Sequence, residues 1–246
     1  MKKNRIAVWF MSLAILCTSS VVLSDDDRVI RVGMPVPGQQ PFFWKNEAGA
    51  ITGIYPDTLR AVATELDLNL EFIPLSQARL VRHFMIGELD LEIGVSPQIK
   101  DPSAMAIVSK FSRPFGIANE VIIFDPELSF PAFILKDLKG QKVATVRGSV
   151  APSYLVREDF SSSRQIALRV SRGWNQVGLM REALAMHYKS ALDLDYKVSL
   201  PYQSNPISFR LHYQRRELLI SIAESLERLE REGVLEEIVC KYLCGS

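Results

Sequence analysis

Apolar and polar positions alternate most clearly in the stretch Gly87–Gln98. Aliphatic residues at positions 89, 91, 93 and 95 are separated by two acidic residues and Gly94, and a period of two predicts a β-strand. Gly94 and Ser96 carry little side chain where this strand ends, so a ligand could reach the backbone there. Ligands of open α/β sheets bind at the carboxyl ends of strands. We therefore expect Gly94, Val95 and Ser96 to form the floor of a binding cleft; a buried strand with an ordinary loop is the alternative.

The chain before this stretch has the spacing of a β-α-β-α-β unit. Apolar residues recur at helical spacing after Pro56, which suits the first turn of a helix, and again between Ser76, a potential cap, and Gly87, a helix stop. The predicted strands on either side are Val29–Met34 and Leu68–Ile73. This order implies a parallel sheet with right-handed crossovers.

A second unit of the same kind is predicted further along. Phe115–Phe124 has the composition of a strand, and an irregular segment containing Pro126 and Pro131 follows it. The later predicted elements are strand Gln141–Val146, a short helix from Pro152, strand Ile166–Val170, helix Trp174–Met186 and strand Tyr196–Leu200. Two such halves in one chain predict an α/β fold of two lobes with a cleft between them.

The end of the chain is patterned more strongly. Ile207–Tyr213 alternates as a strand, an apolar helical face runs from Leu219 to Leu229, and Gly233 stops that helix. A last helix contains Val234 and Tyr242. Charged residues crowd the opposite faces of both helices and are most simply a solvated surface.

The first 24 residues have the features of a secretory signal peptide. A basic start of Lys2, Lys3 and Arg5 precedes an apolar core at 6–17, and small residues lead to Ser24. The apolar core is short for a membrane span, so we expect cleavage and a periplasmic protein; an uncleaved anchor is the alternative.

Composition narrows the function classes. The chain is 48% hydrophobic and 23% charged, which is typical of a globular protein. Loss of residues 1–24 removes three basic residues, which leaves 26 basic against 28 acidic ones and no basic stripe for nucleic acid. Only Cys240 and Cys244 would remain. A disulfide between them is conceivable in an oxidising compartment, although residues four apart on a regular helix would need the last turn to fray.

Candidate binding residues follow the predicted strands. The loop from Pro35 to Pro41 leads to Phe42-Phe43-Trp44, aromatic residues that can stack on a ligand or form a small core cluster. In the second half, Ser149 and Val150 would offer backbone N–H groups to an anion at the start of a helix. Arg147 would add positive charge.

Several loose motifs together resemble one family, the bacterial extracellular solute-binding proteins of family 3, which is the polar amino-acid type with a type II periplasmic-binding fold. Their order and spacing carry the resemblance over residues 28–244. The matching segments are Val29–Gly33 with Pro41-Phe42, Gly53 with Asp57, Gly87 with Asp90, Phe111–Pro114, Lys139–Val143 with Gly148-Ser149, and Glu232–Leu235 with Lys241–Leu243.

The resemblance implies a two-lobed fold crossed twice by hinge strands near Pro114 and Pro206. Residues 25–114 and 206–246 would form the first lobe and 115–205 the second. It implies that a small polar solute binds between the lobes and that a membrane permease reads the closed form; we expect a monomer without a metal or cofactor. The implied contacts, with Trp44 added from the aromatic cluster, are Gln39, Phe42, Trp44, Gly94, Val95, Ser96, Arg147, Gly148, Ser149, Val150 and Tyr188.

Two departures from the family affect the ligand. The arginine that grips an α-carboxylate is missing after the third strand, where Lys100 supplies charge but not a fork. The acidic residue that grips an amine is also missing near Met186-His187-Tyr188. Both anchors of an amino-acid zwitterion are therefore missing, so the ligand need not be an α-amino acid. We expect a small polar solute that is either amino-acid-like or a small carboxylate.

Two other functions remain open from the sequence. One is an enzyme on the same fold, such as a cyclic-acid dehydratase, with Glu92 and His187 as candidate proton-transfer groups; a paired strand residue and a surface histidine are the simpler interpretations. The other is a sensory or scaffold protein without transport. The sequence has no P-loop, metal motif or Ser-His-Asp spacing.

Overall fold

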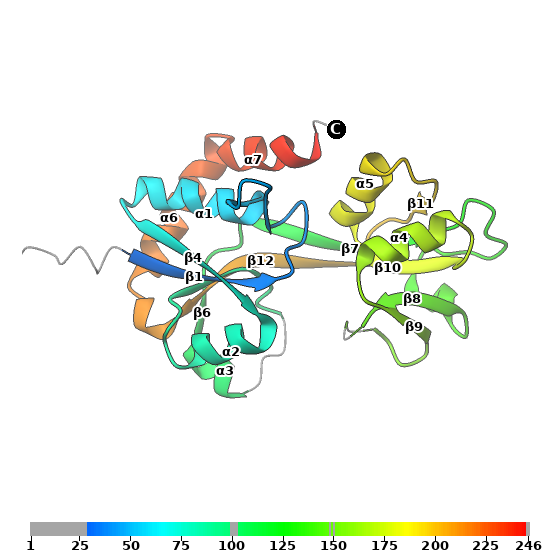
Figure 1. Cartoon of the computed structure of the whole chain (residues 1–246), viewed down its shortest axis with the longest axis horizontal. Helices are drawn as coiled ribbons and strands as arrows, with labels where there is room; N and C mark the ends of the chain where they lie inside the picture. Colours follow the sequence, from blue (N-terminus) through cyan, green and yellow to red (C-terminus); the bar gives the residue numbers. More distant parts are fainter. Residues whose placement is uncertain (1–28, 99–102, 148, 150, 245–246) are drawn as a thin grey trace, which may run out of the picture.

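The computed structural model describes residues 29–98, 103–147, 149 and 151–244. The predicted signal peptide, Lys100, Gly148 and Val150 lie outside the described residues. The described chain forms two lobes joined by a pair of long strands (Figure 1). This two-lobed α/β architecture is the one predicted from the sequence.

The strands of both lobes follow one another in the order β4-β1-β5-β12-β7-β10-β8-β9, which we call the ladder. Lobe 1 is built on its first part, β4-β1-β5-β12, in which β1 is parallel to β4 and β5 as predicted. Its strands are β1 (Val29–Val36), β4 (Asn69–Ser76), β5 (Leu91–Val95), β6 (Ser109–Phe111) and the second half of β12 (Gln203–His212), beside a hairpin of β2 (Trp44–Lys45) and β3 (Ile51–Thr52). Its helices are α1 (Ile54–Glu65), α2 (Gln77–Met85), α3 (Ser103–Val108), α6 (Leu218–Arg231) and α7 (Val234–Leu243).

Lobe 2 continues the ladder with the order β12-β7-β10-β8-β9. Its strands are the first half of β12 with β7 (Gly116–Phe124), β8 (Lys142–Val146), β9 (Val156–Phe160), β10 (Val177–Arg181) and β11 (Lys197–Val198). Its helices are α4 (Ser163–Ser171) and α5 (Glu182–Ala191), and it also contains the short 3₁₀ helix η2 (Leu135–Leu138). A second short 3₁₀ helix, η3 (Tyr213–Arg215), belongs to lobe 1.

Strands β7 and β12 connect the lobes. They pair antiparallel over 116–120 and 203–207, after which β7 pairs with β10 and β12 pairs with β5 and β6. The change of partner on β12 falls between Ile207 and Ser208, beside the predicted crossing at Pro206. The lobe boundaries themselves stay a prediction.

Three predictions in lobe 2 are wrong. Residues 152–155 form a turn, not a helix, and the chain enters β9 parallel to β8. The predicted strand Ile166–Val170 lies within α4, because Ile166, Ala167 and Val170 are spaced as one buried helical face. The predicted helix Trp174–Met186 is β10 followed by α5, and a short apolar run buried on both faces does not show strand alternation.

Strand β5 is buried on both faces, so Glu92 within it and the buried Asp90 just before it need partners. Glu92 lies 2.7 Å from Arg210 of β12, and both side chains are almost fully buried. Asp90 accepts from Arg31 of β1 and from Arg215. Paired charges of this kind explain how an acid within β5 and another just before it can lie in the core. The simpler interpretation of Glu92, as a paired strand residue, is confirmed.

Cys240 and Cys244 form a disulfide at the end of α7, with their Cα atoms 4.6 Å apart. The expected fraying does not occur, because the N–H of Cys244 still donates to the carbonyl of Cys240 at 2.9 Å. The bond therefore joins a regular last helical turn to the residue that ends it.

Candidate functional site

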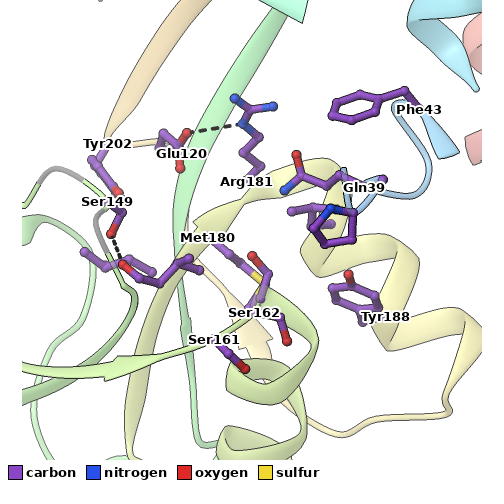
Figure 2. Close-up of a pocket in the computed structure, with 16 residues that line it drawn as sticks. Gln39, Phe43, Glu120, Ser149, Ser161, Ser162, Met180, Arg181, Tyr188 and Tyr202 are labelled. Atoms are coloured by element: carbon purple, nitrogen blue, oxygen red, sulfur yellow. Dashed lines mark hydrogen bonds and ion pairs between the residues drawn. The ribbon is translucent and has the colours of Figure 1, made fainter. Parts of the chain in front are cut away.

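A cavity of about 420 Å³ lies between the lobes (Figure 2). Lobe 1 contributes the loop after β1, through Pro37, Gly38, Gln39 and Phe43. Lobe 2 contributes strand ends and helix starts, among them Glu120, Ser149, Ser162, Arg181, Tyr188 and Tyr202. Strands β8, β9 and β10 run parallel, so their carboxyl ends meet at one edge of the sheet and bring Val146, Ser161 and Arg181 to the cavity.

The start of α4 borders the cavity with three serines. Ser162 is the N-cap and its hydroxyl accepts from the N–H of Gln165 at 3.3 Å, while Ser161 contacts the Gln165 side chain. The first N–H groups of a helix have no partner within it and attract negative charge. A polar or anionic group is therefore favoured at this end of the cavity.

Glu120 and Arg181 form the charged part of the cavity. The Arg181 Nε lies 3.7 Å from a Glu120 carboxylate oxygen, and about a quarter of each side chain is exposed. Burial raises the pKa of Glu120, and the nearby Arg181 only partly opposes that rise. Burial, together with the Glu120 charge, also raises the pKa of the Tyr202 phenol. Tyr202 is therefore a neutral phenol beside Glu120, an acid whose burial is only partly offset by Arg181.

Arg181 also reaches across to lobe 1. Its guanidinium carbon lies 5.3 Å from the centroid of the Phe42 ring, within the range of a cation–π contact. Phe42 in turn stacks on Tyr55 at 5.1 Å. Burial raises the pKa of Tyr55 to about 12. Arg181 lowers this pKa and Glu120 raises it, each by less than burial does. One lobe 2 cation thus sits between an acid of its own lobe and an aromatic group of the other.

The structure brings some predicted residues together. Gln39, Ser149 and Tyr188 line the cavity. Phe42 is buried behind it and borders a second cavity instead, and Trp44 packs edge-on against Tyr242 at 5.5 Å. Of the two interpretations of the aromatic cluster, core packing accounts for Phe42 and Phe43, although Phe43 also borders the cavity.

The strand-end residues of β5 lie away from both cavities. Gly94 has a φ of +70°, and a Cβ there would lie 2.2 Å from the Tyr55 ring, so close packing and backbone conformation account for the glycine. Val95 and Ser96 are buried, and the Ser96 hydroxyl accepts from the N–H of Gln98. Contact between these three residues and a ligand stays a prediction.

The predicted anion site at Ser149 is not built as expected. No helix starts there, and the Ser149 N–H already donates to the Val146 carbonyl at 3.0 Å. Arg147 is exposed and does not line the cavity. The helix starts that reach the cavity are those of α4, at Ser162 and Ser163, and of α5, at Arg181.

Glu120 and Arg181 were not found from the sequence. A lone acid inside the predicted apolar strand Phe115–Phe124 was the available signal for Glu120. Arg181 could not be singled out because its segment has the composition of a helix. In the structure, Arg181 is instead the last residue of β10 and the N-cap of α5.

A second cavity of about 500 Å³ lies on the other side of α5, against the end of α7. His187 lines it, and burial lowers the pKa of His187. Glu92 lines neither cavity, so the two candidate proton-transfer groups are not brought together. Within the described ranges, no group of three acidic, histidine or cysteine side chains could hold a metal ion, and no helix could span a membrane.

The fold and an interlobe cavity define a periplasmic-binding-type protein. The chain belongs to the bacterial extracellular solute-binding proteins, family 3, whose family model matches residues 30–245. It is 25% identical over 262 residues to the probable amino-acid-binding protein YxeM of Bacillus subtilis (strain 168), covering 98% of this chain and 95% of that protein.

Solved structures agree at the level of the fold. An ancestral cationic amino acid solute binding protein matches with a TM-score of 0.72 at 21% identity, covering 89% of this chain and 96% of that one. A histidine kinase sensor domain with similarity to periplasmic binding proteins matches with a TM-score of 0.72 at 21% identity, covering 88% and 97%.

Proposed function

We propose that this protein captures a small polar solute, amino-acid-like or a small carboxylate, between its two lobes. The observation that carries the proposal is the cavity itself, which Gln39 and Phe43 line from lobe 1 and Glu120, Arg181 and Tyr188 line from lobe 2. A ligand that contacts both lobes favours the closed arrangement, because closure adds contacts that the open form lacks.

The same proposal places the protein in the periplasm. Residues 1–24 would direct export and be removed, and a membrane permease would receive the solute from the closed form. The family of extracellular solute-binding proteins and the amino-acid-binding relative support this assignment. Closure would bend the chain at β7 and β12, since these strands connect the lobes.

Thermal unfolding in the presence of individual solutes tests the proposal. A solute at a hundredfold excess over its Kd should add about 2.7 kcal/mol to the free energy of unfolding. The screen should contain amino acids, amines and small carboxylates, together with any solute that native mass spectrometry finds on protein isolated from cells. If none of these raises the Tm, solute capture is wrong and a scaffold role is favoured.

A further inference from the structure

We infer that Glu120 and Arg181 read the charges of the solute: Glu120 binds its cationic group, and Arg181 binds its carboxylate after giving up Glu120. The solute class is then a small molecule that carries both charges. The inference rests on the proposed function, and it gives Arg181 a second role as a built-in competitor for the cation.

The charge of the cavity supports this pairing. Among the described residues that line it, Glu120 and Arg181 are the only charged ones. The remaining polar lining consists of serine, glutamine and tyrosine side chains, and Tyr202 and Tyr188 stay neutral because burial raises the pKa of each phenol. A site with one charge of each sign is complementary to a ligand with one charge of each sign.

The geometry leaves both side chains free to change partner. At 3.7 Å, the Arg181–Glu120 contact is longer than a charge-assisted hydrogen bond, which is usually about 2.7–2.9 Å. Both side chains reach the cavity from adjacent strands, as Figure 2 shows. Arg181 borders the second cavity as well, so it adjoins open space on two sides.

A purely structural role is the competing explanation. Glu120 and Arg181 face each other directly across the antiparallel pair β7–β10, where opposite charges stabilise a sheet. That role predicts lower stability without any dependence on ligand charge. The two explanations therefore differ in a binding measurement that sorts ligands by charge.

Isothermal titration calorimetry with three ligand classes tests the inference. The probes are zwitterionic amino acids, amines without a carboxylate such as cadaverine, and carboxylates without an amine such as glutarate. Glu120→Gln should weaken the binding of zwitterions and amines about tenfold to a hundredfold but tighten the binding of carboxylates, because Arg181 no longer has to give up Glu120. Arg181→Gln should weaken the binding of zwitterions and carboxylates. It should tighten the binding of amines, because the guanidinium group of Arg181 no longer competes with the amine for Glu120.

Matched controls come from neighbouring residues. Glu182→Gln removes the next acid, which lines the second cavity and accepts from Asn119, and Arg172→Gln removes an arginine that packs on Trp174. Neither should change the order of the three classes. Circular dichroism and the Tm of each variant establish that it is folded before binding is compared.

The outcomes separate this inference from the proposed function. If a solute binds wild type but both variants bind all classes as wild type does, solute capture stands and the charge-reading role is wrong. Equal losses across the three classes also overturn it, because a structural pair would behave in that way. If wild type binds nothing, including solutes found on the isolated protein, both proposals are wrong.

Discussion

Gly94 shows how two local constraints fix one residue. Between Glu92 and Val95, strand β5 has one residue more than its partner β12, which is a β-bulge, and Gly94 takes the positive φ that such a bulge uses. The Tyr55 ring then packs directly over it. The sequence shows a glycine near a strand end, and a ligand contact was a reasonable inference from it, but a bulge is not visible in periodicity.

Substitution of Gly94 measures these constraints. Gly94→Ala should destabilise the protein by about 2–5 kcal/mol, because the new Cβ adds a clash with Tyr55 to the cost of a positive φ. Gly140→Ala is the matched control, with a φ of +77° and no atom near the added Cβ, and should cost about 1–2 kcal/mol. Urea denaturation gives both values; equal losses would exclude the clash.

The partly buried carboxylate of Glu120 predicts a pH dependence of cation binding. A cation needs the ionised acid, so affinity should fall as the pH drops through the raised pKa, above the usual glutamate value of about 4.3. The groups near Glu120 are Arg181, Tyr202 and Tyr55, and none of them changes charge in acid, since both phenols have raised pKa values.

The measurement is calorimetric titration with an amine that has no carboxylate, between neutral and acidic pH. Glu120→Gln should bind weakly and show no dependence on pH. An affinity that stays constant in wild type until the pH is well below 4 would contradict a role of Glu120 in holding the cation.

At the scale of elements, the sequence predicts lobe 1 better than lobe 2, where the predicted strands at β7, β8 and β11 are confirmed but the elements from β9 to α5 are not. Helices α1, α2 and α6 carry clear apolar stripes, and their ends are marked by Gly53, Gly87 and Gly233. In lobe 2, β10 is short and buried on both faces, so it shows no alternation, and its segment has the pattern of a helix instead. The site was missed for the same reason, because its charged residues end or interrupt strands of lobe 2.

Asp90 links three elements and predicts sensitivity to acid. Burial alone would raise the pKa of Asp90, but hydrogen bonds from Arg31 and Arg215 outweigh it, and the pKa is lowered. A lowered carboxyl pKa stabilises the fold above the unfolded value, near 3.9, and this contribution is lost as the pH falls through the folded pKa. Asp90 therefore helps to hold β1 and the segment after β12 against β5 at neutral pH.

Removal of this charge should reveal its contribution. Asp90→Asn should lower the free energy of unfolding at pH 7 by about 1–3 kcal/mol, and the difference from wild type should shrink below about pH 4. Glu47→Gln, at an exposed position, is the control and should change little at either pH. Chemical denaturation at both pH values measures the free energy of unfolding of each variant. If the difference between Asp90→Asn and wild type does not depend on pH, the ionisation of Asp90 does not stabilise the fold.

For the whole molecule, the arrangement of β12 matters more than any single contact. This strand lies between β5 and β7 in the ladder, so the sheet parts of both lobes depend on it, although it is the last strand of the chain. Helices α6 and α7 follow it and pack against α1.

This arrangement has a consequence for biogenesis. Until about residue 212 has emerged from the ribosome or the export channel, β5 and β7 each present an unpaired edge, and such edges invite association with other chains. Neither lobe can complete its sheet before β12 is available to pair with β5 and β7. We therefore expect the chain to need protection against aggregation until β12 has been delivered.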